Sequence, residues 1–305
     1  MRMQIIENPS EHQAIVENLI QKYGHSAWHN YFHFQNWDGV EGKNCVFHFE
    51  GRGAILARRK HGIWYVFSEV LAESSNKVEL FKEFVEFCFR DPDIEKVSVE
   101  FEEDFRKDVM SFLKNSPWRA CRVKYDLTCT VFDLARWNDE LKGNEWKKLR
   151  NQKRRFYKDH QIEIVDSNKC SSADLKKIVE EWRKKRGGSD REYYRSYLEA
   201  IENHFAGTRF RRTLVVDSIP STITAGWDIP NQPGYYYSAI GLHNYRCDYL
   251  GEASYLDDLS FLKLQGIRFA NFGGGWDSLL KFKLKFKPSI FYSTYAFSIK
   301  RAGRS

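Results

Sequence analysis

The sequence has no long apolar run. No stretch of about 18 predominantly apolar residues occurs, so a transmembrane helix is not predicted. The first residues, Met-Arg-Met-Gln-Ile-Ile-Glu-Asn, lack the apolar segment of a secretion signal. The six cysteines contain no C-x-x-C pair, which argues against a disulfide framework or a zinc site. Scattered cysteines fit a reducing compartment, and a cytoplasmic location is therefore predicted.

Motifs of nucleophilic hydrolases are also missing. There is no G-x-S-x-G elbow, and Cys247 has no evident base to orient it, so a Ser-His-Asp or Cys-His hydrolase is unsupported. His25, His29 and His33 recur every four residues and would share one side of a helix, as metal ligands can. No carboxylate or cysteine accompanies them at ligand spacing. A buried or interfacial aromatic cluster is the favoured interpretation, and no metal is predicted.

What the chain does contain is enough material for two packed domains. A length of 305 residues corresponds to about two domains of ~150 residues. A hydrophobic content of 42% and an aromatic content of 16% suffice for packed cores. The net charge of +7 is moderate and hints at a polyanionic partner.

Hydrophobic periodicity predicts one order of elements twice: helix, β-meander, helix, strand, helix, strand. In the first half we expect helices at 10–22, 78–90 and 103–114, with Ser10 as an N-cap, and strands at 45–49, 54–57, 64–71, 97–101 and within 118–134. In the second half we expect helices at 172–186, 191–205, 251–265 and 277–286, and strands at 162–165, 213–216, 221–227, 235–241, 267–272 and a final pair around 291–299. Helices between strands require crossovers onto a shared sheet, so the fold class is mixed α/β (α+β).

The segment that joins the halves, residues 137–160, is predicted to be one continuous basic helix. Trp146, Leu149 and Phe156 would share a buried face. Eight cations face only two acids between residues 142 and 159: Lys142, Lys147, Lys148, Arg150, Lys153, Arg154, Arg155 and Lys158 against Glu145 and Asp159. A solvated helix face and a phosphate-contacting stripe are both open interpretations. The shortage of intrahelical partners favours an external anion.

Residues 267–288 are the most informative stretch. A predicted strand runs into Gly273, Gly274 and Gly275, and a short lysine-rich helix follows until Pro288. Glycine lets a ligand approach the backbone closely, and a helix N-terminus attracts anions. Lys283 is flanked by apolar positions, which predicts a partly desolvated lysine that needs a partner. The alternative is a tight strand-to-helix turn before a lysine-rich surface helix.

Two further regions are candidates for a substrate wall. Trp227 and Tyr237 border the Pro/Gly turn at 229–234, where hairpin packing is the alternative interpretation. Residues 248–253 stand where Gcn5-related acetyltransferases carry their acyl-CoA pyrophosphate loop. Gly251 fits that loop, but Asp248 and Glu252 would put two carboxylates beside a pyrophosphate.

Together these features resemble a known family. The element order resembles two Gcn5-related acyltransferase domains in tandem, at 1–136 and 161–305, joined by the basic helix 137–160, with the active site expected in the second. Residues 143–156 resemble the arginine-containing helix before the second domain, and residues 271–274 with 280–288 resemble its terminal "G-G … FK-x-x-F-x-P" signature. Both motifs occur in Fem-type aminoacyltransferases and in the C-terminal domain of phosphatidylglycerol lysyltransferases.

The resemblance implies transfer of an aminoacyl group from aminoacyl-tRNA, as co-substrate, to an amine or hydroxyl of a small-molecule, peptide or lipid acceptor. No tightly bound cofactor is implied. In this family the lysine matched by Lys283, preceded by Phe282, lies at the reaction site. The arginine matched by Arg150 lies toward the acceptor's phosphates, and Arg154 shares its helix. Two alternatives stay open: an acyl-CoA-dependent N-acyltransferase and a non-catalytic RNA-binding tandem module.

The expected chemistry assigns roles to a few residues. Lys283 would stabilise the oxyanion that develops on the ester carbonyl. The 3′ adenosine of the tRNA would stack on Phe282 or Trp276. No general base stands out, and Asp277 and Glu252 are the first carboxylates to examine. The sequence does not indicate an oligomeric state.

Overall fold

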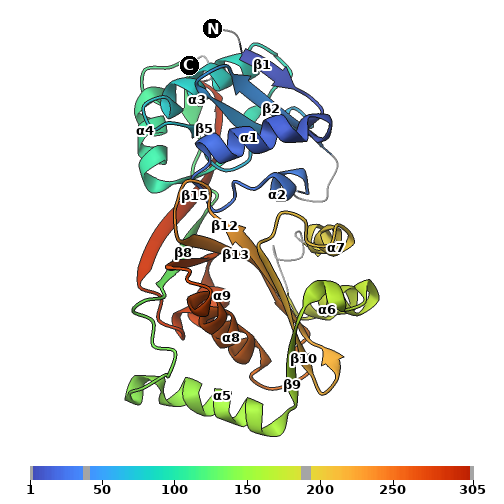
Figure 1. Ribbon diagram of the computed structural model, residues 1–305. Helices are drawn as coiled ribbons and strands as arrows, with labels where there is room; N and C mark the ends of the chain where they lie inside the picture. The colour runs from blue at the N-terminus through green and yellow to red at the C-terminus, as the bar shows by residue number, and fades with distance from the viewer. Residues whose placement is uncertain (1–2, 37–41, 187–193, 303–305) are drawn as a thin grey trace.

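The computed structural model describes residues 3–36, 42–186 and 194–302. Within these residues, fifteen strands form one sheet with the main order β1-β2-β3-β4-β6-β15-β8-β14-β13-β12-β10-β11. Parallel and antiparallel pairs both occur, and helices cover both faces (Figure 1). The predicted mixed α/β class is therefore confirmed.

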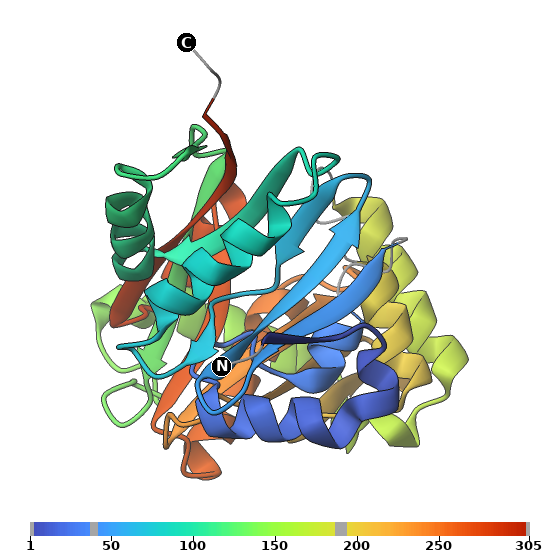
Figure 2. The ribbon, with the colours of Figure 1, turned by 90° about the horizontal axis from the view of Figure 1, so that it is seen from above.

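The first half forms one end of the sheet. Its elements are β1 (Met3–Ile6), η1 (Pro9–His12), α1 (Gln13–Tyr23), α2 (Tyr31–Gln35), β2 (Lys43–Phe49), β3 (Gly53–Lys60), β4 (Ile63–Val66), β5 (Leu71–Ala72), α3 (Lys77–Cys88), β6 (Lys96–Glu102), α4 (Glu103–Leu113), β7 (Trp118–Ala120) and β8 (Tyr125–Asp133). Alternate strand residues face opposite layers. Phe47 and Ile55 pack with α3 and α4, whereas Val46 and Leu56 pack with α1. Figure 2 shows these helices on opposite sides of the first-half strands.

The second half repeats this arrangement. Its elements are η2 (Asn144–Trp146), α5 (Lys147–Asp159), β9 (Ile162–Asp166), η3 (Ser167–Lys169), α6 (Ser172–Lys185), α7 (Tyr194–Glu202), β10 (Phe210–Val216), β11 (Ile219–Pro220), β12 (Thr222–Asp228), β13 (Tyr235–His243), α8 (Leu250–Leu264), β14 (Phe269–Gly275), α9 (Asp277–Leu284) and β15 (Ile290–Arg301). Ile223 and Leu242 pack with α6 and α7, whereas Tyr236 and Ala270 pack with α8.

The two halves exchange their last strands. β8, which ends the first half, pairs with β14 of the second half, and β15, which ends the chain, pairs with β6 of the first half. β8 and β15 also pair with each other, so the sheet is continuous (Figure 1). The domain bounds 1–136, 137–160 and 161–305 stay a prediction. The final strand pair expected around 291–299 is instead one long strand.

Several predicted elements have different limits. The first helix starts at Gln13 after the 3₁₀ turn η1, and Ser10 does not cap it. The strand expected over 64–71 is divided into β4 and β5, because Ser68 has a left-handed φ of 63° that interrupts the ladder. Of the helix expected at 191–205, residues 191–193 lie outside the described residues.

The joining helix is shorter than predicted. Residues 137–143 are not helical, because Leu141 and Gly143 have φ values of 53° and 107°, which a right-handed helix excludes. The α-helix α5 begins only at Lys147. Its buried residues Leu149 and Phe156 pack in the two cores that contain α8, as the predicted apolar face requires.

Candidate active site

A cleft of about 1630 Å³ lies between the two halves. Its floor is one face of the four central strands β6, β15, β8 and β14. Thr294 pairs with Glu102 on one side and with Leu127 on the other, and Cys129 pairs with both Tyr292 and Gly274. Side chains at paired positions share a face, so the strand exchange brings both halves into one floor.

The three glycines form a bulge in β14. The register of β14 against β8 shifts between Asn271 and Gly274, and Gly273 has a φ of 70°. The Asn271 side-chain oxygen accepts a hydrogen bond from the Gly273 N–H at 2.8 Å. A Cβ at Gly273 would lie 3.2 Å from the Tyr237 hydroxyl oxygen. The alternative interpretation, a tight strand-to-helix turn at the glycines, does not hold: the glycines extend β14, and α9 begins after Trp276.

Lys283 lies against this bulge. Its side chain is buried, with the residue 6% exposed, and it also lines the cleft. The ammonium donates hydrogen bonds to the carbonyl oxygens of Phe272 at 2.6 Å, Gly273 at 2.9 Å and Gly274 at 2.8 Å. An ammonium has three N–H donors, and these three carbonyls match them. Lys283 therefore fixes the bulge and places a positive charge in the cleft wall.

Most of the predicted site residues meet in this cleft. Those that line it are Lys283, Phe282, Gly273, Gly274, Gly275, Trp276, Trp227, Tyr237 and Glu252. Asp277 does not line it; this residue is exposed at the start of α9 with a φ of 43°. Arg150 and Arg154 do not line it either. Their helix, α5, lies at the far end of the second half, below α8 (Figure 1).

The cations of α5 differ in their surroundings. Arg150 donates to the carbonyl oxygens of Leu141 and Gly143, so it holds the loop before the helix. Arg154 is exposed. The Arg155 guanidinium lies 5.9 Å from the ring centre of Tyr249, which is a cleft residue. The C-terminal part of α5 therefore approaches a residue at the edge of the cleft. The predicted role of the α5 cations in phosphate binding stays a prediction.

The aromatic candidates are not equally available. Phe282 packs against Tyr255 and Phe286, with ring centres 5.6 and 5.2 Å apart. Trp276 is 40% exposed and lies 5.6 Å from the Tyr125 ring. Trp276 is therefore better placed than Phe282 to stack on an incoming base.

Trp227 connects the two halves. Its indole N–H donates to the Ala27 carbonyl at 2.9 Å, and its ring lies 5.3 Å from both Tyr237 and His33. Burial lowers the pKa of His33 to about 4, so the imidazole is neutral within this aromatic cluster. His33 therefore packs in an aromatic cluster at the interface of the two halves.

The other two histidines are not on a helix and have separate partners. His29 accepts hydrogen bonds from the backbone N–H groups of His25 and Ser26, and burial lowers its pKa to about 3. His25 Nε2 lies 3.0 Å from Glu69 and 2.7 Å from the Lys77 ammonium. Among the described residues, no group of three His, Cys, Asp or Glu side chains is arranged to hold a metal ion.

Sequence reasoning missed the carboxylates of the cleft. Glu69, Glu100 and Glu102 line it from the first half. Burial raises the pKa of Glu69, but the hydrogen bond from His25 and the Lys77 charge outweigh this and the net pKa is lowered. Burial raises the pKa of Glu100, although hydroxyl donors oppose the shift. These residues belong to no sequence motif. The one signal in the sequence is that Glu100 and Glu102 are two residues apart on β6 and therefore share a face of the sheet.

Another missed carboxylate lies in the second half. Asp258 of α8 lines the cleft, and burial raises its pKa to about 6. The Ser238 hydroxyl donates to it at 3.2 Å, and the Arg212 guanidinium lies 3.6 Å away. A helix pattern alone cannot show that one of its polar residues turns inward.

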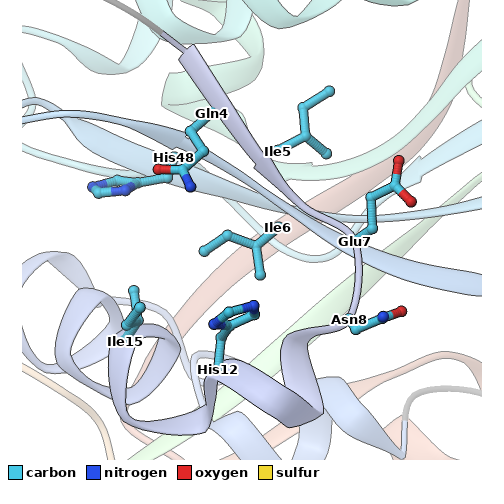
Figure 3. A pocket seen from close by; sticks show the side chains of 8 residues that line it. All are labelled: Gln4, Ile5, Ile6, Glu7, Asn8, His12, Ile15 and His48. Atoms are coloured by element: carbon cyan, nitrogen blue, oxygen red, sulfur yellow. The ribbon is translucent and has the colours of Figure 1, made fainter.

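A second, smaller hollow of about 370 Å³ lies between β1 and α1 (Figure 3). It is lined by Gln4, Ile5, Ile6, Glu7, Asn8, His12, Ile15 and His48, and it contains none of the predicted site residues. The central cleft is therefore the candidate active site. In the described part of the chain, no helix has both the length and the apolar character to span a bilayer.

The fold is that of two Gcn5-related acyltransferase-like halves in tandem, as the sequence predicts. Residues 32–209, more than half of the chain, match the family described as phosphatidylglycerol lysyltransferase, C-terminal. The chain belongs to this family and is a transferase. The matched residues include α5 and end before β10. No curated protein sequence matches the chain.

Solved structures share the fold over nearly the whole chain. L-PGS from Bacillus licheniformis has a TM-score of 0.71 at 15% identity, covering 98% of this chain and 94% of that one. A conserved protein of unknown function from Bacteroides thetaiotaomicron has a TM-score of 0.72 at 13% identity, covering 98% and 100%. A tandem GNAT protein from the clavulanic acid biosynthesis pathway has 0.57 at 12%, covering 100% of both. At such identities the likeness concerns the fold alone.

Proposed function

We propose that this chain transfers an aminoacyl group from an aminoacyl-tRNA to a nucleophilic acceptor in the central cleft. The observation that carries the proposal is the buried Lys283 ammonium beside the Gly273 bulge, in the wall of a cleft that both halves form. Membership of a lysyltransferase family supports an aminoacyl group as the group transferred. A cytoplasmic location and the absence of a tightly bound cofactor belong to the same proposal.

The chemistry needs no covalent enzyme intermediate. The ester of a charged tRNA is already activated, so an acceptor nitrogen or oxygen attacks its carbonyl directly. The new C–N or C–O bond forms, the ester C–O bond breaks, and the tRNA leaves with its terminal hydroxyl. Negative charge develops on the carbonyl oxygen during the attack. The Lys283 ammonium, whose three N–H groups are bound to the carbonyls of the bulge, stabilises it as a fixed positive charge.

The surfaces around the cleft support a nucleic-acid donor. Trp276 offers an exposed ring on which the terminal adenosine of the tRNA can stack. Arg154 and Lys158 are exposed on α5, and Arg155 approaches the cleft mouth. Such cations contribute sequence-independent contacts to phosphates. Asp248 and Glu252, by contrast, put two carboxylates at the start of α8, where an acyl-CoA pyrophosphate would bind.

The test is single-turnover transfer from charged tRNA. Purified protein is mixed with aminoacyl-tRNA and a panel of amine, peptide and lipid acceptors, and loss of the ester is compared with its spontaneous hydrolysis. We expect acceptor-dependent consumption, lost in Lys283→Ala and retained in Lys300→Ala, an exposed lysine of β15 that does not line the cleft. Circular dichroism confirms that both variants are folded.

Two other outcomes would replace the proposal. If acyl-CoA is the donor, acetyl-CoA or a longer acyl-CoA at 100 times its dissociation constant raises stability by roughly 2.7 kcal/mol, and charged tRNA is not consumed. If the chain only binds RNA, tRNA binding depends on salt and no donor is consumed.

A further inference from the structure

The proposed reaction needs a group that takes the acceptor's proton, and the two carboxylates expected for it are not available. Asp277 lies outside the cleft. Glu252 lines it, but its carboxylate accepts a hydrogen bond from the Lys285 ammonium at 2.8 Å. Asp258 of α8 also lines the cleft, but it is held by the Ser238 hydroxyl and the Arg212 guanidinium. The base is therefore sought among the carboxylates of the first half.

Glu102 has an unusual position. It is the last residue of β6 and also the N-cap residue of α4, with φ −64° and ψ 157°. Short polar side chains such as Asp or Ser at an N-cap accept a hydrogen bond from the first turn of the helix, and the longer Glu is not among these capping residues. The Glu102 carboxylate makes no such bond and lines the cleft. Among the described residues it has no hydrogen-bond or ion-pair partner.

Its two neighbours are engaged. Glu69 accepts from the Glu102 backbone N–H at 3.3 Å and from the Lys77 ammonium at 3.2 Å, and lies 3.0 Å from His25. Glu100 accepts from the Thr294 hydroxyl at 2.6 Å and from the Tyr125 hydroxyl at 3.0 Å. Of these three carboxylates, Glu102 alone offers its oxygens to a molecule in the cleft.

The surroundings of Glu102 suit a base that works near neutral pH. Glu102 is exposed to the open cleft. Desolvation by the protein around it and then the charge of Glu69 raise its pKa to about 7, and Asp104 adds to the increase, whereas His25 and Lys77 oppose it. A general base is most effective when its pKa lies near the working pH. The helix terminus at α4 also favours the ionised form.

Glu102 and Lys283 act on the same part of the floor. The pKa of the Cys129 thiol on this floor is raised to about 12, chiefly by burial; Lys283 lowers that pKa and Glu102 raises it. The two groups therefore line one cleft, Glu102 from the first half and Lys283 from the second.

Resting on the proposed function, we propose that Glu102 binds the acceptor as an alkylammonium ion and receives its proton, so that a primary amine is the acceptor class. An unpaired carboxylate attracts a cation, whereas an anionic phosphate is repelled beside Glu69, Glu100 and Glu102. The ammonium gives one proton to Glu102, and the freed nitrogen forms the amide bond as the ester bond breaks. A second proton leaves the nitrogen and the tRNA oxygen gains one.

The experiment uses the full chain, labelled aminoacyl-tRNA and three acceptors: Nα-acetyl-lysinamide, Nα-acetyl-serinamide and phosphatidylglycerol vesicles. We expect the amine to be consumed fastest. Glu102→Gln should lower the rate by roughly 10²–10⁴-fold without changing tRNA affinity. The matched control is Glu103→Gln, an exposed neighbour that does not line the cleft. A longer blocked peptide with one lysine is compared with Nα-acetyl-lysinamide. Faster transfer to the peptide indicates a peptide acceptor, and faster transfer to the amide indicates a small molecule.

The pH profile provides a readout that a structural role would not move. An alkylamine has a pKa of about 10.4, so it stays an ammonium ion across the neutral range. If Glu102 takes its proton, the wild-type rate rises to about pH 7 and then levels, and Glu102→Gln loses this inflection. A rate that keeps rising above this pH, unchanged rates in Glu102→Gln, or faster transfer to phosphatidylglycerol would overturn the proposal. Absence of any tRNA-dependent transfer in the wild type would instead refute the proposed function.

Discussion

Thr294 of β15 lies directly opposite Glu102 of β6, although one residue is near the end of the chain and the other is in its first third. The Thr294 hydroxyl also donates to Glu100, two residues before Glu102. The last strand of the protein therefore builds the first half's side of the cleft. Neither half contains a complete sheet or a complete cleft without the other.

The strand exchange predicts that a C-terminal residue stabilises the first half. Ile299 of β15 is 0% exposed and belongs to the core around α3 and α4. We expect Ile299→Ala to lower the free energy of unfolding by about 2–5 kcal/mol, measured by urea denaturation. Ile219→Ala, at a residue that is 38% exposed, is the control and should have little effect. Two separate unfolding transitions, of which Ile299→Ala shifts only that of the second half, would contradict the exchange.

Removing the Lys283 amine should destabilise the protein as well as inactivate it. Lys283→Met leaves the carbonyls of Phe272 and Gly273 without their buried donor. Each unsatisfied group costs about 1–3 kcal/mol, so we expect a fall in unfolding free energy of that order or more. Lys281→Met, on the exposed face of α9, should leave stability unchanged. Equal stability of both variants would show that the ammonium does not hold the bulge.

The bulge itself is tested by Gly273→Ala. The left-handed φ of 70° costs about 1–2 kcal/mol for alanine, and the added Cβ would press on Tyr237. Gly266→Ala is a matched control, since its φ is 78° and its Cβ would meet nothing within 4 Å. We expect thermal denaturation to show the larger loss at Gly273, with transfer activity lost only there. Equal losses would mean that the Tyr237 contact is unimportant.

Acid should destabilise the fold before any carboxylate pair is broken. Burial lowers the pKa of His29 to about 3 and those of His33 and His243 to about 4. The unfolded chain binds these protons near pH 6.5, so stability is complete above that pH and falls as the pH drops toward the folded values. Each histidine adds a slope of up to about 1.36 kcal/mol per pH unit.

The variant that isolates this effect is His33→Phe, which keeps an aromatic ring beside Trp227. We expect the pH slope of the unfolding free energy between about pH 6.5 and 4 to decrease by close to one proton. Burial raises the pKa of Asp258 to about 6, and this group contributes a pH slope of opposite sign. The contribution is the same in the wild type and in His33→Phe, so it cancels from the difference between their slopes. An unchanged slope would show that His33 is already protonated in the folded state.

The exposed ring of Trp276 gives a prediction about the donor. Stacking of one base on an aromatic side chain is worth about 1–3 kcal/mol, so Trp276→Ala should weaken binding of charged tRNA by that amount. Trp276→Phe should retain most of the affinity, because the stacking surface remains. Filter binding at fixed salt measures both. Equal affinity of Trp276→Ala and the wild type would place the terminal adenosine elsewhere.

The sequence by itself determined the order of elements, the mixed α/β class and the family. These depend on residues near one another along the chain: the apolar period of α5, the turn at 229–234, and the lysine between Phe282 and Phe286. The prediction that Lys283 is partly desolvated also followed from its apolar neighbours alone, and the structure buries this side chain in the cleft wall.

Only the tertiary structure decided where the glycines bend, how the last strands are exchanged and which carboxylates reach the cleft. Register between β6 and β15 is set by pairing across most of the chain's length, and a local pattern contains no information about it. Gly273 forms a bulge because β8 pairs on both sides of it, and Glu102 enters the cleft because α4 starts at the floor of a sheet completed by β15. Local periodicity fixes elements, whereas distant pairing fixes the site.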